Sequence, residues 1–161
     1  MLKVQDLSIE FHDQKVPKTV VFDFDLQIEE GEIVGLVGES GSGKTVSALS
    51  IAGLLSRKNL GKKGSISFEG VDILNCSRKE LRSLQGDDIA MVFQEPMTSL
   101  DPLKKIGYQV EESLVIHKKL PREERREKVI SALKEVELNN VELIMEQYPH
   151  ELSGGMRQRV M

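Results

Sequence analysis

The sequence is poor in the features that mark several classes of protein. Its single cysteine, Cys76, excludes an internal disulfide and a cysteine metal cluster. Its longest apolar runs, 33–37 and 89–93, fall far short of the ~20 residues of a membrane-spanning helix, and the N-terminus lacks a signal-peptide pattern. Lys and Arg number 22 against 26 Asp and Glu, and the net charge of −4 argues against a nucleic-acid partner. These absences predict a cytoplasmic protein.

The sequence does have the composition and patterning of one soluble domain. Its 161 residues are 39% hydrophobic and 30% charged, and a chain of this length can bury a substantial core. Residues 3–11 and 20–28 alternate apolar and polar side chains, which predicts a half-buried antiparallel pair of strands. The run EIVGLVG, residues 32–38, is almost entirely apolar and ends in glycine, which is typical of a parallel strand buried on both faces.

The second half of the chain turns from one more predicted strand to helices. DIAMVF, residues 88–93, predicts a second buried strand, and the character of the chain beyond it is helical, with one helix around 106–117 and a second at 122–136. The second of these helices is expected to bury one face, formed by Val129, Leu133 and Val136. The predicted fold class is α/β, with an antiparallel N-terminal part, a parallel core that includes segments 33–37 and 88–93, and helices beyond it.

The strongest motif is GESGSGKT, which stands directly after the first buried strand and directly before a predicted helix. It matches the phosphate-loop pattern G-x-x-x-x-G-K-[ST]. Glycines let backbone N–H groups face phosphate oxygens, Lys44 supplies a cation, and the Thr45 hydroxyl is a ligand for Mg²⁺. The alternative, a flexible Gly/Ser linker, would not place Lys-Thr at the start of a helix. The candidate nucleotide-binding residues are Gly38, Glu39, Ser40, Gly41, Ser42, Gly43, Lys44, Thr45 and Val46.

A glutamine follows the second predicted strand. In FQEPMTSLDP, residues 93–102, Gln94 stands at the C-terminal end of a strand, where open α/β sheets bind their ligands. Gln94 is therefore a candidate contact for the metal or the attacking water. A glutamine at such a position is, taken alone, more often an ordinary turn residue. The phosphate loop, for its part, is shared by GTPases, kinases and transport ATPases.

The closing segment ELSGGMRQRVM, residues 151–161, separates these classes. Ser153 and the two glycines after it precede a predicted helix, and N–H groups at a helix start form an anion site. With the phosphate loop and Gln94 in this order, LSGGMRQR resembles the signature motif of the ATP-binding subunits of ABC transporters. FQEPMTSLDP and YPHELSGGMRQRVM resemble the D-type subunits of oligopeptide, dipeptide and nickel importers, which share Met156. The likeness covers residues 2–161.

The resemblance implies a P-loop NTPase fold of the ABC ATPase type and an ATPase that couples ATP binding and hydrolysis to uptake of peptides or similar small solutes. It implies a single, incomplete ATP-binding domain with three parts. These are an α/β nucleotide-binding core at 1–94, a helical subdomain at 95–150, and the signature motif with the start of its helix at 151–161. The implied cofactors are ATP and Mg²⁺, with Lys44 and Gln94 catalytic and Thr45 and Gln94 at the metal. Phe11 falls where the family places a ring against adenine, although it could equally be a core residue of its strand.

The resemblance also implies partners and a location. Ser153, Gly154 and Gly155 would close over the ATP of a second ABC ATPase subunit in a head-to-tail homodimer or heterodimer. Residues 95–114 would dock transmembrane permease subunits, supported by the apolar residues Met97, Leu100, Leu103 and Ile106. An extracytoplasmic solute-binding protein would act indirectly, and no nucleic acid is implied. The protein would be peripheral, on the cytoplasmic face of the membrane.

In the resembled family the chain continues past the signature to the Walker B strand, which ends in Asp-Glu, and to a switch histidine. The sequence ends at Met161 without them. The resemblance therefore implies a core whose C-terminal part is missing, weak stability, and binding of MgATP without turnover by this chain alone. Three interpretations remain open: an importer ATP-binding subunit, a catalytically inactive nucleotide-binding or interaction fragment, and another P-loop enzyme. The absence of the GTPase motif Asn-Lys-x-Asp argues against the last.

Overall fold

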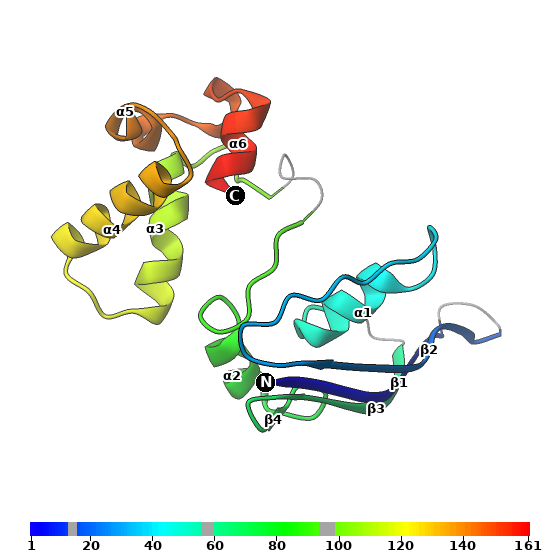
Figure 1. The fold of residues 1–161 in the computed structure, drawn as a ribbon. Helices are drawn as coiled ribbons and strands as arrows, with labels where there is room; N and C mark the ends of the chain where they lie inside the picture. The colour runs from blue at the N-terminus through cyan, green and yellow to red at the C-terminus, as the bar shows by residue number, and fades with distance from the viewer. Residues whose placement is uncertain (13–15, 56–59, 94–98) are drawn as a thin grey trace. The chain divides into compact units, whose positions relative to one another are not determined.

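The structure, a computed structural model, describes residues 1–12, 16–55, 60–93 and 99–161. The chain divides into two compact units, Met1–Ile89 and Ala90–Met161 (Figure 1). Each unit has its own cluster of buried apolar side chains. The functional division at residue 94 that the sequence implied stays a prediction.

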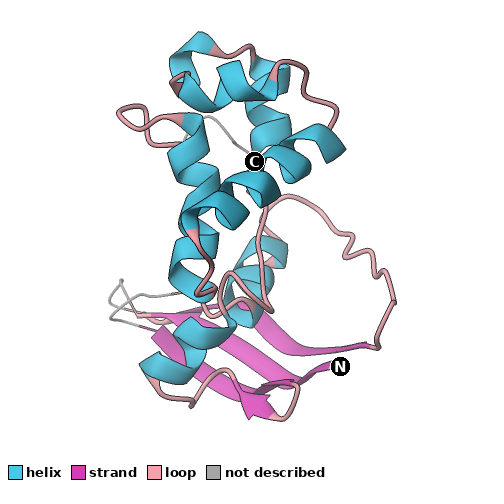
Figure 2. Ribbon diagram, turned by 90° about the vertical axis from the view of Figure 1, so that its left-hand side faces the viewer, coloured by secondary structure: helices cyan, strands magenta, loops and turns pink. Residues whose placement is uncertain are grey.

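The first unit is built on an antiparallel sheet. Among the described residues the sheet has four strands in the order β2-β1-β3-β4. Figure 2 draws these strands in magenta. The strands are β1 (Leu2–Phe11), β2 (Lys18–Ile28), β3 (Leu60–Phe68) and β4 (Val71–Asp72). β1 lies between β2 and β3 and pairs antiparallel with both, so the predicted antiparallel pair is confirmed.

An irregularity in β1 determines which of its side chains are buried. A regular strand turns every second residue to the same face, yet Val4, Leu7 and Ile9 are all buried, with exposed fractions of 2%, 0% and 0%. The register of β1 shifts between Val4 and Leu7 against β2, and Asp6 between them has a positive φ of 50°. This bulge inserts one extra residue, which brings Leu7 onto the same face as Val4.

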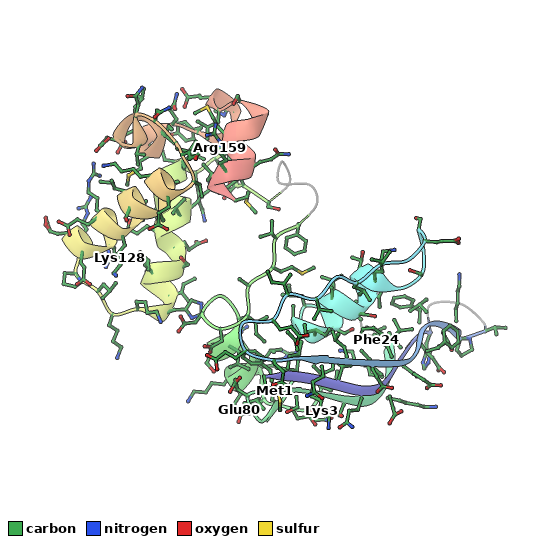
Figure 3. All side chains as sticks on the ribbon, viewed as in Figure 1. Met1, Lys3, Phe24, Glu80, Lys128 and Arg159 are labelled. Atoms are coloured by element: carbon green, nitrogen blue, oxygen red, sulfur yellow. The ribbon has the colours of Figure 1, made fainter. Side chains whose placement is uncertain are left out.

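Helix α1 (Lys44–Ile51) lies over one face of this sheet (Figure 1). Its side chains Val46 and Ile51 pack on the core of β1, β2 and β3, together with Phe24 of β2, labelled in Figure 3. The position of α1 matters for function because the phosphate-loop motif, residues 38–45, ends in its first turn. The sheet and α1 together therefore hold the end of that loop.

Helix α2 (Arg78–Leu84) begins with a reciprocal cap. The Ser77 hydroxyl accepts a hydrogen bond from the N–H of Glu80, and the Glu80 carboxylate accepts one from the N–H of Ser77. The side-chain hydrogen bond with Ser77, reinforced by that backbone hydrogen bond, lowers the pKa of Glu80 below its usual value. The cap thus satisfies backbone N–H groups at the start of α2.

The two segments predicted as parallel strands are not strands in this structure. Residues 33–37 have no regular secondary structure, and in segment 88–93 only an isolated bridge between Gln85 and Ile89 forms. Ile33 is 98% exposed and Val37 92% exposed, where a buried strand was expected. A strand buried on both faces needs neighbouring strands for its backbone hydrogen bonds and layers on both sides, and the described residues supply neither.

The second unit is helical. It contains α3 (Ile106–His117), α4 (Arg122–Glu135), α5 (Val141–Glu146), a 3-10 helix at Pro149–Glu151 and α6 (Gly154–Val160). The predicted helices at 106–117 and 122–136 are thus confirmed, with the second ending one residue earlier. None of the helices that the described residues form is both long and apolar enough to span a membrane.

The helices of the second unit enclose a core of their own. Val129 and Leu133 of α4 are 1% and 2% exposed, as their spacing predicted, but Val136 is 37% exposed because it follows the end of the helix. Ile106 at the start of α3 is fully buried. The remaining members of this core are Leu100, Leu138, Val141, Ile144, Met145 and Leu152.

Candidate functional site

The phosphate-loop motif ends at the first turn of α1. Gly43 is the N-cap residue and adopts a left-handed conformation with φ of 91°. Because glycine has no side chain, it cannot cap the helix, and the first N–H groups of any α-helix lack acceptors within the helix. These donors and the positive end of the helix dipole at Lys44 and Thr45 are suited to an anion such as phosphate.

The Lys44 side chain folds back over the loop that precedes it. Its Nζ atom donates to the carbonyl oxygens of Gly38 at 2.7 Å and Glu39 at 2.6 Å, and to the Ser42 hydroxyl at 3.3 Å. An ammonium group has three donors, so these contacts use all of them. The lysine therefore fixes the curvature of the loop, and a phosphate that binds Lys44 must replace at least one of these contacts.

Gly43 also sets how closely the loop approaches the sheet. A Cβ atom at this position would lie 2.6 Å from the carbonyl oxygen of Val20 and 3.2 Å from Cγ2 of Val21, both in β2. No side chain fits in that space, and the left-handed backbone favours glycine as well. Sequence reasoning identified Gly43 as a phosphate-loop residue, but it did not find Val20, because nothing in the sequence of β2 marks a contact with the loop.

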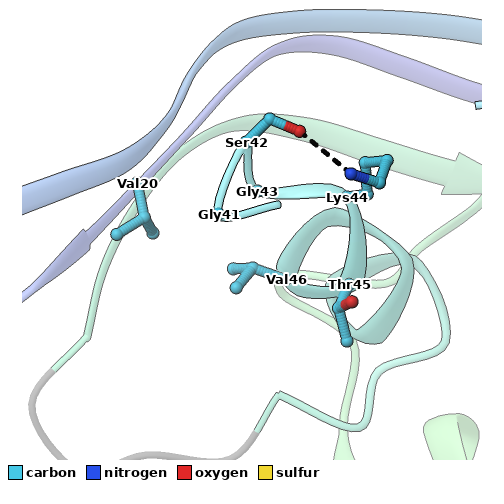
Figure 4. Close-up of a pocket in the computed structure, with 7 residues that line it drawn as sticks. All are labelled: Val20, Gly41, Ser42, Gly43, Lys44, Thr45 and Val46. Atoms are coloured by element: carbon cyan, nitrogen blue, oxygen red, sulfur yellow. Dashed lines mark hydrogen bonds between the residues drawn. The ribbon is translucent and has the colours of Figure 1, made fainter. Parts of the chain in front are cut away.

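A cavity of about 180 Å³ opens at this point, lined by Val20, Gly41, Ser42, Gly43, Lys44, Thr45 and Val46 (Figure 4). It is smaller than the roughly 300–1,000 Å³ of complete small-molecule sites. Its polar lining comes from the loop and the start of α1, and its apolar lining from Val20 and Val46. The cavity therefore suits part of a nucleotide, in the manner of a phosphate group, more than a whole one.

Of the two predicted metal ligands, Thr45 and Gln94, the structure describes Thr45. Thr45 is exposed in the first turn of α1 and lines the same cavity as Lys44. Its hydroxyl oxygen fits Mg²⁺, which takes oxygen ligands and commonly shares them with substrate phosphates. The described part of the chain has no group of three or more His, Cys, Asp or Glu that could hold a metal. Gln94, the other predicted ligand, lies outside the described residues.

Three other predicted site residues belong to the first unit. Glu39 and Ser40 lie in the phosphate loop and are exposed. Phe11, the predicted adenine contact, is half-buried at the end of β1, where it pairs with Lys18 of β2 and Leu60 of β3. It is not among the residues that line the cavity at Lys44. Its role at adenine stays a prediction.

The signature residues form the start of α6 in the second unit. The Ser153 hydroxyl accepts a hydrogen bond from the N–H of Met156 at 3.3 Å and so caps the helix. Gly154 and Gly155 are exposed, and a Cβ atom added at either would meet no heavy atom within 4 Å. The start of α6 is thus an open surface of backbone, which a second molecule can approach closely.

The segment that leads into the signature is held to the start of α3. Lys105 Nζ donates to Glu146 Oε2 at 2.7 Å, and the N–H of Ile106 donates to the carbonyl oxygen of Gln147 at 2.9 Å. The hydrogen bond with Lys105 lowers the pKa of Glu146, and that with Glu146 raises the pKa of Lys105. These contacts fix the chain shortly before the turn at Ser153.

The predicted docking surface at residues 95–114 is corrected in part. Leu100 and Ile106, cited as apolar support for it, are 8% and 0% exposed and belong to the core of the second unit. Met97 lies outside the described residues. Leu103, by contrast, is 85% exposed. Of the three residues that the structure describes, only Leu103 is an exposed apolar contact.

Comparison with known proteins agrees with the order of these motifs. Residues 21–161, which include the phosphate loop and the signature, match a family described as ABC transporter. The chain belongs to the ABC transporter family.

Among curated relatives, the dipeptide transport ATP-binding protein DppD of Haemophilus influenzae is 43% identical over 161 residues. The oligopeptide transport ATP-binding protein AppD of Bacillus subtilis is 44% identical over 163 residues. Each alignment covers 100% of this chain and 49% of the relative. The chain therefore spans about half the length of the curated relatives it matches.

Solved ABC transporter structures confirm the fold class. The ATP-binding cassette MJ0796, in a dimer described as a post-hydrolysis state bound to ADP and Pi, matches with a TM-score of 0.85 at 28% identity. That match covers 99% of this chain and 66% of the cassette. CbiO1 from Clostridium perfringens matches with a TM-score of 0.72 at 27% identity, over 99% of this chain and 58% of cbiO1. The P-loop ATPase fold predicted from the sequence is thus confirmed.

Proposed function

We propose that this chain is the nucleotide-holding part of the ATP-binding subunit of an ABC importer for peptides or similar small solutes. The observation that carries the proposal is Lys44 at the start of α1, within a phosphate loop that precedes an open LSGG turn in a chain of this family. The names of DppD and AppD, which are dipeptide and oligopeptide transport proteins, support peptides as the transported class.

Each phosphate-loop residue contributes through its own chemistry. The backbone N–H groups of residues 38–45 and the first turn of α1 would donate to phosphate oxygens, and Lys44 would exchange its contacts with Gly38 and Glu39 for the β- and γ-phosphates. Thr45, with Gln94, would hold Mg²⁺. When bound, that ion neutralises charge on the phosphates. Gln94 would also orient the attacking water, and Phe11 would contact adenine.

The open turn at Ser153 would act on a second molecule. Ser153, Gly154 and Gly155 present a hydroxyl and backbone N–H groups without a bulky side chain nearby, which suits the phosphates of an ATP bound to another subunit. The proposed assembly is a head-to-tail homodimer or heterodimer, and the solved relative MJ0796 is a dimer. In this arrangement each subunit completes the small site at the other's phosphate loop.

The remaining partners follow from transport. Transmembrane permease subunits would dock on the segment after Gln94, with Leu103 as its exposed apolar contact. An extracytoplasmic solute-binding protein would deliver the solute to the permease. The ATP-binding subunit would then sit peripherally on the cytoplasmic face of the membrane. Crosslinking from a Leu103→Cys variant to the permease in an active transporter tests the docking, and no crosslink would count against it.

A second candidate function is nucleotide binding without hydrolysis. The chain spans 49% of its curated relatives, and among its described residues no acidic side chain lines the cavity at Lys44. Catalysis of phosphoryl transfer consists largely of positioning the nucleophile, so the lack of a carboxylate to orient water would cost several orders of magnitude in rate. A phosphate-release assay on the 161-residue chain tests this candidate: retained ATP binding without turnover supports it, and turnover that disappears with Lys44→Ala contradicts it.

A further inference from the structure

A short loop precedes α3 in the second unit, at residues 101–104. The N–H of Leu103 donates to the Asp101 carboxylate at 2.9 Å, and the N–H of Lys104 donates to the Asp101 carbonyl oxygen at 3.2 Å. These bonds make a tight turn in which Asp101 uses its side chain as a turn partner. Leu103 stands at the outside of this turn with 85% of its surface exposed.

The side chain of Gln109, one turn into α3, binds this loop at three points. Its Oε1 atom accepts a hydrogen bond from the N–H of Asp101 at 2.8 Å. Its Nε2 atom donates to the carbonyl oxygens of Asp101 at 2.9 Å and Lys104 at 2.8 Å. All three bonds are partly buried, and one amide group thereby satisfies three backbone groups at both ends of the turn.

Other contacts of the loop are weaker. Lys104 lies 3.8 Å from Asp101 and 3.6 Å from Glu112, with about half of each side chain exposed, and its ammonium group stands 5.2 Å from the ring centre of Tyr108. Exposed ion pairs contribute little to stability. A partly buried group that loses its hydrogen-bond partner is costly by comparison. Gln109 is therefore the main support of the loop outside the loop itself.

We infer that Gln109 is a positioning residue that holds residues 101–104 in the conformation that presents Leu103 to a membrane subunit. The inference rests on the proposed function, in which this loop docks the permease. A flexible loop would lose conformational entropy on docking, which weakens binding, whereas a loop that is already ordered avoids that loss. The three bonds from Gln109 supply this order, and they connect the docking contact directly to α3.

Spin-label mobility at position 103 tests the clamp itself. A Leu103→Cys variant, with Cys76→Ser to leave a single thiol, carries a nitroxide label in the 161-residue chain. Gln109→Leu removes all three hydrogen bonds while keeping a side chain of similar size, and we expect the label in this variant to be more mobile. The matched control is Ser113→Ala on the same helix, whose hydroxyl donates to the carbonyl oxygen of Val110 within α3. An unchanged label in Gln109→Leu overturns the inference.

The Gln109→Glu variant adds a readout that simple loss of packing would not produce. At pH 8 its carboxylate cannot donate to the two carbonyl oxygens and repels them, so we expect a mobile label. As the pH falls through the pKa of that carboxyl, ordinarily ~4.3, the protonated form regains one donor and the label becomes less mobile. The charged groups around this position are Asp101, Lys104 and Glu112, and they are the same in Gln109→Leu. Any change of label mobility with pH in Gln109→Leu therefore measures the effect of their titration alone. Mobility that responds to pH equally in both variants contradicts the role of Gln109.

A third measurement separates this inference from the proposed function. In an assembled transporter, the crosslink from Leu103→Cys to the permease should fall several-fold when Gln109→Leu is added. Affinity for an ATP analogue should not change, because Lys44 belongs to the other unit. An undiminished crosslink overturns the positioning role. The absence of a crosslink in every background contradicts the proposed docking and the presentation of Leu103, whereas the label mobility still reports on the clamp.

Discussion

Replacing Gly43 by alanine should damage the phosphate loop in a way that the structure lets us estimate. The added Cβ atom would lie 2.6 Å from the Val20 carbonyl oxygen and 3.2 Å from Cγ2 of Val21, in a residue whose φ is 91°. Gly41 offers a matched control, because its φ is also positive, at 83°, while a Cβ atom there would meet nothing within 4 Å. The two variants therefore share the backbone strain and differ in the clash.

The free energies follow from these two contributions. A left-handed conformation costs an alanine about 1–2 kcal/mol, and this is the expected loss of stability for Gly41→Ala. Overpacking against a fixed neighbour adds about 1–3 kcal/mol, so Gly43→Ala should lose about 2–5 kcal/mol. Because relief of the clash moves the loop off β2, Gly43→Ala should also weaken ATP binding by at least about tenfold, a change that corresponds to 1.4 kcal/mol.

The assay must report on the first unit alone. Urea unfolding followed by hydrogen exchange of the β1 amides does so, because β1 lies at the centre of the sheet of that unit. A titration of the same variants with a fluorescent ATP analogue measures the change in ATP affinity. If Gly43→Ala and Gly41→Ala lose equal stability, the close approach of the loop to Val20 contributes nothing, and the reasoning is refuted.

Three further predictions concern the helical unit. Leu133→Ala should destabilise it by about 2–5 kcal/mol in a denaturant titration, since the side chain is 2% exposed and its loss leaves a cavity. Lys134→Ala, at an exposed position of the same helix, is the control and should change the stability little. Ser153→Ala should cost about 1 kcal/mol through loss of the α6 cap, and unchanged protection of the Met156 amide in hydrogen exchange would refute this. The hydrogen bond that Lys105 donates to Glu146 lowers the pKa of Glu146 below its ordinary 4.5 and raises the pKa of Lys105 above its ordinary 10.5, so the pair stabilises fully between these values. Its contribution should disappear as pH falls through the lowered pKa or rises through the raised one, and Glu146→Gln should abolish the acid part of this dependence in unfolding curves measured across pH.

Much of the local structure could be predicted because it depends on neighbours in sequence. The alternation of residues 3–11 and 20–28 predicted β1 and β2, and the helical spacing of Val129 and Leu133 predicted α4. The phosphate loop was identified from its motif and does stand at the start of α1. In each case the pattern reflects one buried face or one helix start, and the chain itself supplies what that element needs.

The errors concern elements that depend on distant parts of a fold. The apolar run 33–37 has the composition of a buried strand, yet composition cannot supply the neighbouring strands that such a strand requires, and Ile33 is almost fully exposed. Leu100 and Ile106 were assigned to a docking surface because they are apolar, but they fill the core of the helical unit. Gln109 could not be found from sequence, because its role depends on the loop at residues 101–104 folding back onto α3.

Nucleotide binding at Lys44 is the central claim, and a titration of the 161-residue chain with a fluorescent ATP analogue and Mg²⁺ tests it most directly. Lys44→Ala removes both the cation for the phosphates and the contacts with Gly38 and Glu39 that shape the loop, so affinity should fall by at least ~10-fold. Lys128→Ala, the same charge change at an exposed position of α4, is the matched control and should bind like the parent. Equal affinity of Lys44→Ala and the parent chain would show that GESGSGKT does not form the nucleotide site.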